Sequence, residues 1–167
     1  MSADVVRAVT LLGATITMGL GAGVFALYAH TIMPGLHNTD DRTFVGAFQA
    51  LDRAIINPWF MASAFIGPGL LAIAATIANL GRPALPWVGA ALGLYLIAVV
   101  ITIAVNVPLN DALKAAGDPD RIHDLARVRD QFHEARWAAW NLVRVVTTTT
   151  AFGLLAWALV VHGRSTG

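Results

Sequence analysis

The order of apolar and polar positions divides the chain into four long apolar stretches separated by three connections. The apolar stretches cover residues 5–33, 59–79, 85–105 and 138–161. Each reaches about 20 residues or more, the length of a helix that crosses the hydrocarbon core of a bilayer. We therefore predict an all-α fold, a four-transmembrane-helix bundle that forms a single integral-membrane domain over residues 1–167.

The connection between the first two spans carries a pattern of its own. Thr39 and the acidic pair that follows it are typical of a helix start. Phe44, Phe48, Leu51 and Ile55 then fall on one helical face. We predict an additional short amphipathic helix here, which lies along the membrane interface or covers the mouth of the bundle.

Three prolines and a long helical pattern near the end of the sequence predict the structure of the remaining spans. Asn57 before Pro58 predicts the capped start of the second span, and Pro68 and Pro108 predict local disturbances of the second and third. From Asp118 the helical pattern runs to the end of the fourth span without an evident break. Such a helix would extend about 64 Å, about twice the thickness of a bilayer core. We therefore expect a long fourth helix whose first half projects or bends.

Composition narrows the class of protein. The chain is 57% hydrophobic and 13% charged, against about 25% charged residues in soluble domains. It has no cysteine, which excludes disulfides, thiolate metal sites, iron–sulfur clusters and covalently attached haem. A net charge of +1 gives no field that would attract nucleic acid. The partner that this composition predicts is the lipid bilayer, and we expect a multi-pass protein of a bacterial cell membrane.

Counting spans places the polar residues on one side of the membrane. The end of the first span, the start of the second, the end of the third and the start of the fourth all face the same side. Arginine and lysine are more numerous in the connections there, which favours the cytoplasm, but those connections are also longer, so the orientation stays open. The polar residues brought to this side are His30, Asn57, Asn106, Asn110, His133, Asn141 and Arg144.

One helical face of the fourth span concentrates polar chemistry. His133, Trp137, Asn141 and Arg144 are spaced by four, four and three residues, so one helix would align them. An arginine inside a span costs about 2.5 to 3.5 kcal/mol on insertion scales, and intramembrane ionisable residues are usually functional. The alternative is that Arg144 binds backbone carbonyls or Asp111 and that Trp137 belongs to an interfacial aromatic belt.

Two further pairs of side chains are candidates for the same site. Asn106 and Asn110 lie one helical turn apart around Pro108, where their amides would orient a substrate or satisfy backbone groups that the proline frees. His30 and His133 would hold a transition metal, since neutral imidazole is a common ligand. Because the chain has no short metal-binding motif, ordinary hydrogen-bonded histidines are the alternative.

The motifs at the span ends carry a resemblance to a known family. They are Phe25 to Pro34, the run Asn106-Val107-Pro108-Leu109-Asn110, and Arg136-Trp137-x-x-x-Asn141-x-x-Arg144. With these motifs on four spans, the chain resembles the anthrone-oxygenase-like family, also called the domain of unknown function 1772 family, over roughly residues 5–161. The resemblance implies oxidation of an anthrone to an anthraquinone, although most members have no assigned activity. The matching positions are Asn106, Asn110, Trp137, Asn141 and Arg144.

This resemblance leads to a mechanistic hypothesis for the polar face. His133 would remove a proton from a polycyclic phenolic substrate, and Arg144 and Asn141 would stabilise the resulting oxyanion before dioxygen reacts. Trp137, with Asn106 and Asn110, would bind the flat substrate. The reaction would need either no cofactor or a transition metal bound by histidines.

A second class of function stays open at this stage. The same pocket would serve a non-catalytic membrane protein, either an accessory subunit or a binding protein for a small molecule or metal. Assembly into a homo-oligomer is equally open.

Overall fold

The computed structural model describes residues 3–166 of the chain. The first part of the chain forms α1 (Ala3–Leu27), the π turn η1 (Tyr28–Ile32), α2 (Met33–His37) and α3 (Asp41–Ile55). The middle part forms α4 (Pro58–Phe60), η2 (Met61–Phe65), α5 (Ile66–Ala78), α6 (Leu85–Ile101), η3 (Thr102–Asn106) and α7 (Val107–Ala115). The last part forms α8 (Leu125–Gln131) and α9 (Glu134–Thr166).

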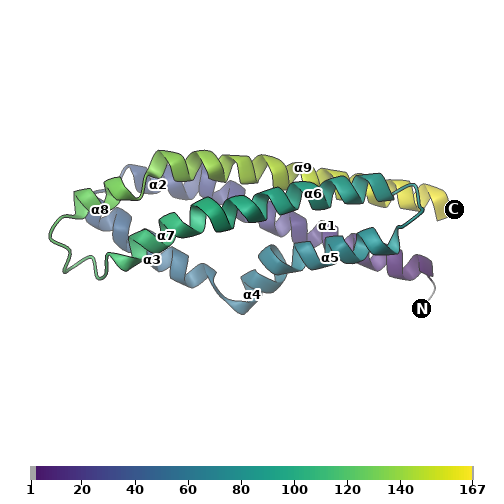
Figure 1. The fold of residues 1–167 in the computed structure, drawn as a ribbon, viewed down its shortest axis with the longest axis horizontal. Coiled ribbons are helices and arrows are strands. Elements are labelled where there is room, and N and C mark those ends of the chain that lie inside the picture. The colour runs from purple at the N-terminus through teal and green to yellow at the C-terminus, as the bar shows by residue number, and fades with distance from the viewer. Residues whose placement is uncertain (1–2, 167) are drawn as a thin grey trace.

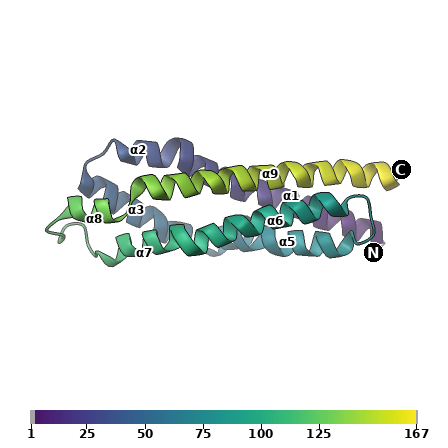
Figure 2. The ribbon, with the colours of Figure 1, turned by 45° about the horizontal axis from the view of Figure 1, so that its top comes forward.

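The helices form an elongated bundle with two different ends. Figure 1 shows the two chain ends together at one end of the bundle, and α2, α3, α7 and α8 gathered at the other. α9 packs along both α1 and α6, and α5 packs along the same two helices. The turned view in Figure 2 shows the same separation of the two ends. The end that carries α3 and α8, called the polar end below, is the side where the span count places the polar residues.

Four helical stretches are long and apolar enough to cross a membrane. They are Ala3–His37, Pro58–Ala78, Leu85–Ala115 and Leu125–Ser165. Residues 3–166 contain no strand. The predicted all-α fold with four spans is therefore confirmed, and the length and composition of these helices identify a membrane protein. In the first span the helix does not end at Met33, the last residue of the apolar stretch. It continues through Pro34 to His37.

The sides of the bundle are built from large residues outside and small residues inside. Ala14, Ala75 and Ala91 are buried where the spans meet, whereas Ile16 and Ile77 are 61% and 63% exposed. Small inward residues allow membrane helices to approach closely. The large outward residues form an apolar surface that suits contact with lipid tails.

A π turn precedes a proline in each of the first three spans. Pro34, Pro68 and Pro108 lie two or three residues beyond η1, η2 and η3. Proline has no N–H to donate and its ring clashes with the carbonyl four residues earlier. That carbonyl lies inside the π turn in every case, and the wider turn accommodates it. The disturbances predicted at Pro68 and Pro108 are thus present as π turns toward the polar end of the bundle.

The freed carbonyl of Ala64 illustrates the effect on packing. Pro68 cannot bond this oxygen, and it lies against Gly21 of α1, where a Cβ atom would approach it to 2.5 Å. Only glycine fits this contact, since real Cβ atoms do not come so close. The π turn η2 and α1 therefore meet backbone to backbone.

The predicted amphipathic helix is present as α3, and it covers the mouth of the bundle. Phe44 and Phe48 are buried, and the ring of Phe48 lies 4.7 Å from Phe132 and 5.7 Å from Trp137 between centroids. Leu51, which the sequence pattern placed on the same face, is exposed instead. An aromatic cluster thus closes the polar end.

The fourth helix is interrupted, contrary to the uninterrupted pattern that the sequence predicted. Residues 118–124 are not helical, α8 begins only after the cap Asp124, and the helix breaks again between Gln131 and Glu134. His133 adopts a φ of 51°, in the left-handed region that residues other than glycine rarely enter. The first half of the predicted helix therefore bends away instead of projecting straight.

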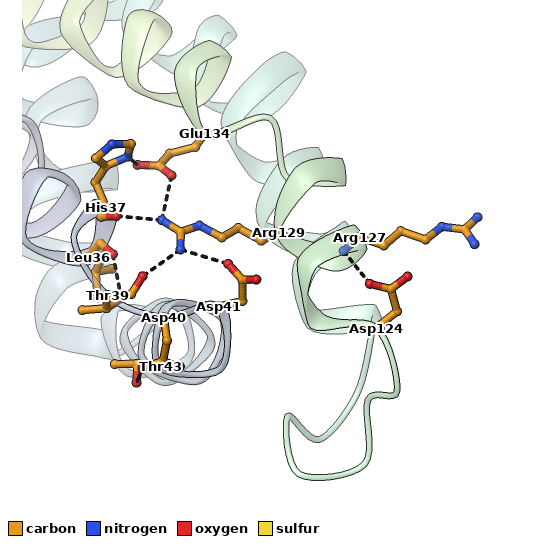
Figure 3. A network of polar contacts seen from close by, with 10 residues as sticks. All are labelled: Leu36, His37, Thr39, Asp40, Asp41, Thr43, Asp124, Arg127, Arg129 and Glu134. Carbon is orange, nitrogen blue, oxygen red and sulfur yellow. Dashed lines mark hydrogen bonds and ion pairs between the residues drawn. The ribbon is translucent and has the colours of Figure 1, made fainter.

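A cluster around Arg129 holds this bend. Arg129 donates to the carbonyl oxygens of His37 and Thr39, at 2.9 Å in both cases. It also forms ion pairs with Asp41 at 3.1 Å and with Glu134 at 3.4 Å. Figure 3 shows these groups converging on one guanidinium from the end of α2, the start of α3 and the start of α9. The contacts tie α8 to the mouth of the bundle.

Candidate functional site

A cavity of about 210 Å³ lies below this mouth, between α1, α3, η2, η3 and α9. It is larger than the roughly 150 Å³ apolar cavity that accommodates benzene in an engineered protein. Its apolar and aromatic walls are formed by Val24, Phe25, Tyr28, Phe48, Ile55, Ile56, Phe60, Met61, Phe65, Val107 and Trp137. Its further polar lining comes from Asp52, Thr102, Asn110 and Arg144. Such a cavity suits a flat apolar molecule with a few polar atoms.

Arg144 places a fixed cation at the cavity wall. Its side chain is buried, and it donates to the hydroxyl of Thr102 at 3.2 Å and to the amide oxygen of Asn141 at 2.9 Å. The guanidinium carbon also lies 4.4 Å from the ring centroid of Phe25 and 5.4 Å from that of Trp137. Its Nε is buried and has no hydrogen-bond partner within residues 3–166. The guanidinium is therefore held in position, and its Nε–H donor is not used by these contacts.

Asn141 links this cation to the first span. Its amide nitrogen donates to the carbonyl oxygen of Phe25 at 3.0 Å, while its amide oxygen accepts from Arg144. These contacts differ from the alternative expected from the sequence, in which Arg144 binds backbone carbonyls or Asp111. Arg144 is instead held by neutral polar side chains. No acidic side chain within residues 3–166 forms an ion pair with it.

A chain of hydrogen bonds runs along the cavity lining from Trp137 to Asp52. The indole N–H of Trp137 donates to the amide oxygen of Asn110 at 2.7 Å, and the amide nitrogen of Asn110 donates to Asp52 Oδ1 at 2.7 Å. The second oxygen of Asp52 forms an ion pair with Lys114 at 2.7 Å. The chain joins α9, α7 and α3. Trp137 is thus buried in the site and does not belong to an interfacial belt.

Asn106 lies beside this chain but not in the cavity wall. It is buried and donates to the carbonyl oxygen of Trp137 at 3.3 Å, so it braces η3 against α9. Its own amide oxygen is buried, and no group in the described part of the chain donates a hydrogen bond to it. Of the two asparagines that bracket Pro108, only Asn110 lines the cavity.

His133 lies apart from the other predicted catalytic residues. It is exposed and lines a separate surface hollow with Asp41, Arg129 and Asp130, which shares no residue with the cavity. The expectation that it shares one continuous helical face with Trp137 is wrong, because the chain breaks between α8 and α9. The break turns the imidazole away from the face that carries Arg144.

His30 is also outside the cavity lining. It is exposed, and its Nδ1 lies 2.6 Å from the hydroxyl of Thr31. Among residues 3–166, no group of three or more histidine, aspartate or glutamate side chains is arranged to hold a metal ion. Metal binding by His30 and His133 therefore stays a prediction from residue type.

The cavity also contains residues that the sequence analysis did not select. Asp52, Tyr28 and Thr102 all line it. Asp52 carried a readable signal, since it follows Phe44 and Phe48 at four-residue spacing on the buried face of α3. An acid at that position of an apolar face indicates a polar function within the bundle.

Comparison with protein families gives a match over the second and third parts of the chain. A family model described as anthrone oxygenase matches residues 56–154. The match begins after α3 and extends from α4 into α9, so it is narrower than the range of roughly residues 5–161 expected from the motifs. Searches of curated proteins and of solved structures gave no significant match.

The matched segment contains the two later motifs of the resemblance, whereas the motif Phe25 to Pro34 lies outside it. Asn106, Asn110, Trp137, Asn141 and Arg144 all lie within it, and all but Asn106 and Asn141 line the cavity directly. Asp52 and Tyr28 lie outside it, on the elements that close the cavity. Because the match covers more than half of the chain, the protein belongs to the anthrone oxygenase family.

Proposed function

We propose that the protein is a membrane-embedded oxygenase, placed in a bacterial cell membrane, that oxidises an anthrone-type or other polycyclic phenolic compound with dioxygen. The reaction takes place in the cavity at the polar end of the bundle. The observation that carries the proposal is the buried guanidinium of Arg144 at the wall of a cavity that is otherwise largely aromatic and apolar. Family membership supports the same class of reaction.

The chemistry of an anthrone explains why such a cation is useful. The methylene group between its two benzene rings is a carbon acid. Loss of a proton gives an anion whose charge resides largely on the ketone oxygen, because the central ring then becomes aromatic. A preorganised donor in a water-poor site stabilises such an oxyanion strongly. Arg144 is already oriented by Thr102 and Asn141, so it need not reorganise when the charge develops.

The overall oxidation balances without an external reductant. One anthrone and one dioxygen give one anthraquinone and one water. The methylene carbon loses four electrons and two hydrogens, and dioxygen accepts the four electrons. One oxygen atom becomes the new quinone carbonyl and the other leaves as water. The electron-rich anion is itself the reductant, so the main tasks of the protein are to form the anion and to hold it.

The walls of the cavity provide the binding surface for the rings. Phe25, Phe48 and Trp137 offer aromatic faces and edges, which favour stacked or edge-on contact with a polycyclic molecule. Asn110 and Tyr28 add polar groups for phenolic oxygens. His133 lines a different hollow, so we assign it no step in the reaction.

Oxygen uptake by the detergent-purified protein tests the proposal. With anthrone as substrate, we expect uptake above the spontaneous rate, and with ¹⁸O₂ we expect one labelled atom in the quinone. Val24→Phe, which fills the cavity, should lower the uptake. Leu20→Phe is the matched control, since it lies one turn earlier on the same helix and faces outward.

Two results would contradict an oxygenase. No uptake above the spontaneous rate across several anthrones would do so, and so would equal uptake in Val24→Phe and in the control Leu20→Phe. Tight binding of an anthraquinone without any turnover would instead identify the same cavity as the site of a binding protein or accessory subunit.

A further inference from the structure

We infer that Asp52 is the proton acceptor of this site, removing a proton from the substrate carbon while Arg144 faces the substrate oxygen. The inference rests on the proposed function, since it concerns how the anion forms in the same cavity. It replaces a histidine base with a carboxylate contributed by α3, outside the segment that the family match covers.

The first support is the position of the carboxylate. The Asp52 side chain is only 8% exposed, yet it lines the cavity. α3 reaches this place because Phe44 and Phe48, about two turns and one turn earlier on the same face, pack into the aromatic cluster at the mouth. A buried acid is costly unless it is paired or has a function.

The second support is the separation of the two buried charges. Asp52 and Arg144 line the same cavity, but within residues 3–166 no ion pair joins them. Asp52 is held by Asn110 and Lys114, and Arg144 by Thr102 and Asn141. Opposite charges attract strongly in a medium of low dielectric constant. Because each charge has its own partners, both remain available to a ligand in the cavity that they line.

An anthrone requires two such groups. Its acidic methylene carbon and its ketone oxygen occupy opposite positions of the central ring. A base and an oxyanion partner that line one cavity but are held by different partners can therefore address the two ends of the same molecule. A carboxylate base working with oxyanion donors is an established solution for carbon acids.

The hydrogen bonds of Asp52 leave it able to accept a proton. A carboxylate offers about four acceptor positions. Asn110 donates to Oδ1, whereas Oδ2 forms an ion pair with Lys114 and accepts no hydrogen bond within residues 3–166. The indole of Trp137 can only donate, so its bond to the oxygen of Asn110 turns the amide nitrogen toward Asp52. Asn110 and Trp137 are thus positioning residues for the base.

The proposed step can be written with its atoms and electrons balanced. The C–H bond of the methylene group breaks, and the proton passes to an oxygen of Asp52. The electron pair of that bond enters the ring system and gives a negative charge on the ketone oxygen beside Arg144. Lys114 pairs with both Asp52 and the exposed Asp111, and its side chain is 26% exposed. As an ammonium group it has no lone pair to accept the proton, so the proton passes from Asp52 to water and the carboxylate then pairs with Lys114 again.

Hydrogen exchange without dioxygen tests this step separately from the oxidation. Under anaerobic conditions in D₂O, the protein should accelerate deuterium uptake at the methylene carbon of anthrone above the spontaneous rate. Asp52→Asn should lower that acceleration by about 10²-fold or more, the usual contribution of a general base. Asp111→Asn is the matched control, because it also contacts Lys114 but does not line the cavity, and it should exchange like the parent.

Further measurements separate a base from a structural acid. Binding of anthraquinone should be retained in Asp52→Asn, and added formate should partly restore its exchange. If Asp52→Asn does not fold, Asp52→Glu keeps a carboxylate and should retain measurable exchange. Equal exchange in the parent and Asp52→Asn, or none above the spontaneous rate in the parent, would overturn the inference.

The outcomes for the two proposals differ. Exchange that depends on Asp52 without oxygen uptake would leave the base in place and reject the oxidation. Oxygen uptake that is unchanged in Asp52→Asn would leave the oxidation in place and reject the base.

Discussion

Trp137 and Asn110 join the fourth span to the third through a hydrogen bond of 2.7 Å between the indole N–H and the amide oxygen. The same indole ring lines the cavity and lies 5.7 Å from the ring of Tyr28 between centroids. One side chain thus forms part of the binding wall and also orients the amide beside Asp52. Because the N–H and the ring make different contacts, a substitution can remove the first and keep an aromatic ring in the cavity wall.

Trp137→Phe keeps an aromatic ring at this position but removes the indole N–H. The protein should become less stable, because the amide oxygen of Asn110 loses its hydrogen-bond partner. The expected loss is about 1 to 3 kcal/mol of the free energy of unfolding. Thermal unfolding in detergent measures it. Trp140→Phe is the control, since Trp140 is 39% exposed on the same helix and should change stability by no more than about 0.5 kcal/mol. Equal losses would contradict the importance of this bond.

Arg144→Met should separate activity from stability. The substitution removes the oxyanion partner, so we expect turnover of anthrone to fall by about 10²-fold or more. It also removes a buried cation at the cost of two hydrogen bonds, so the unfolding temperature should stay the same or rise. The exposed Arg136→Met serves as control for oxygen uptake and unfolding. A loss of folding with Arg144→Met would indicate a structural residue instead.

Asp40 should make α3 sensitive to acid. Hydrogen bonds from the hydroxyl and backbone N–H of Thr43 hold the pKa of Asp40 below its usual range. A lowered pKa contributes stability above the ordinary value of about 3.9, and this stability is lost as the pH falls through the folded-state value. Unfolding should therefore become easier toward pH 3 in the parent. Asp40→Asn, a cap that does not titrate, should lose less over this range, and identical pH profiles would contradict the assignment.

Arg129→Ala should loosen the bend between α8 and α9. The substitution removes two bonds to backbone carbonyls and two ion pairs at the mouth of the bundle. Amide hydrogen exchange in α8 should become faster, as should proteolysis at the junction. Arg127→Ala is a close control, because that side chain is exposed and points away from the cluster in Figure 3. Comparable exchange in the two variants would show that the cluster does not hold the bend.

The spans and their polar side could be predicted from the sequence because both depend on local patterns. An apolar stretch of sufficient length indicates a span wherever it lies in the fold. Asn57 before Pro58 indicated a helix start, and its side chain does accept the backbone N–H of Phe60 at 2.9 Å. Counting spans then placed Asn110 and Arg144 at the same end without any knowledge of packing.

The break before α9 depends on contacts that no local pattern contains. Neither proline nor glycine lies between Pro119 and the start of α9, so the sequence around His133 resembles a continuous helix. Phe132 is buried against α3 and Arg129 binds the end of α2, about 90 residues earlier in the chain. These distant partners decide where the helix ends, and with it the place of His133.

Asp52 was missed for a related reason. The sequence pattern continued the apolar face of α3 from Phe48 to Leu51 and Ile55, which treats the acid between them as solvent-facing. In the bundle, Leu51 is exposed and Asp52 is buried beside Asn110. The partners that make this burial acceptable lie on α7, and a search for apolar positions does not consider them.

The π turns before the three prolines have a consequence for how this cavity changes among related chains. Each π turn contains one residue more than an α-helical turn, so it rotates the rest of its helix by about 100°. A related chain whose proline is displaced by one position should carry its extra residue to a new place. Its cavity would then receive a neighbouring side chain although no cavity residue had been substituted. The set of side chains that line this cavity therefore depends on the positions of Pro34, Pro68 and Pro108 as well as on the identity of the residues that face it.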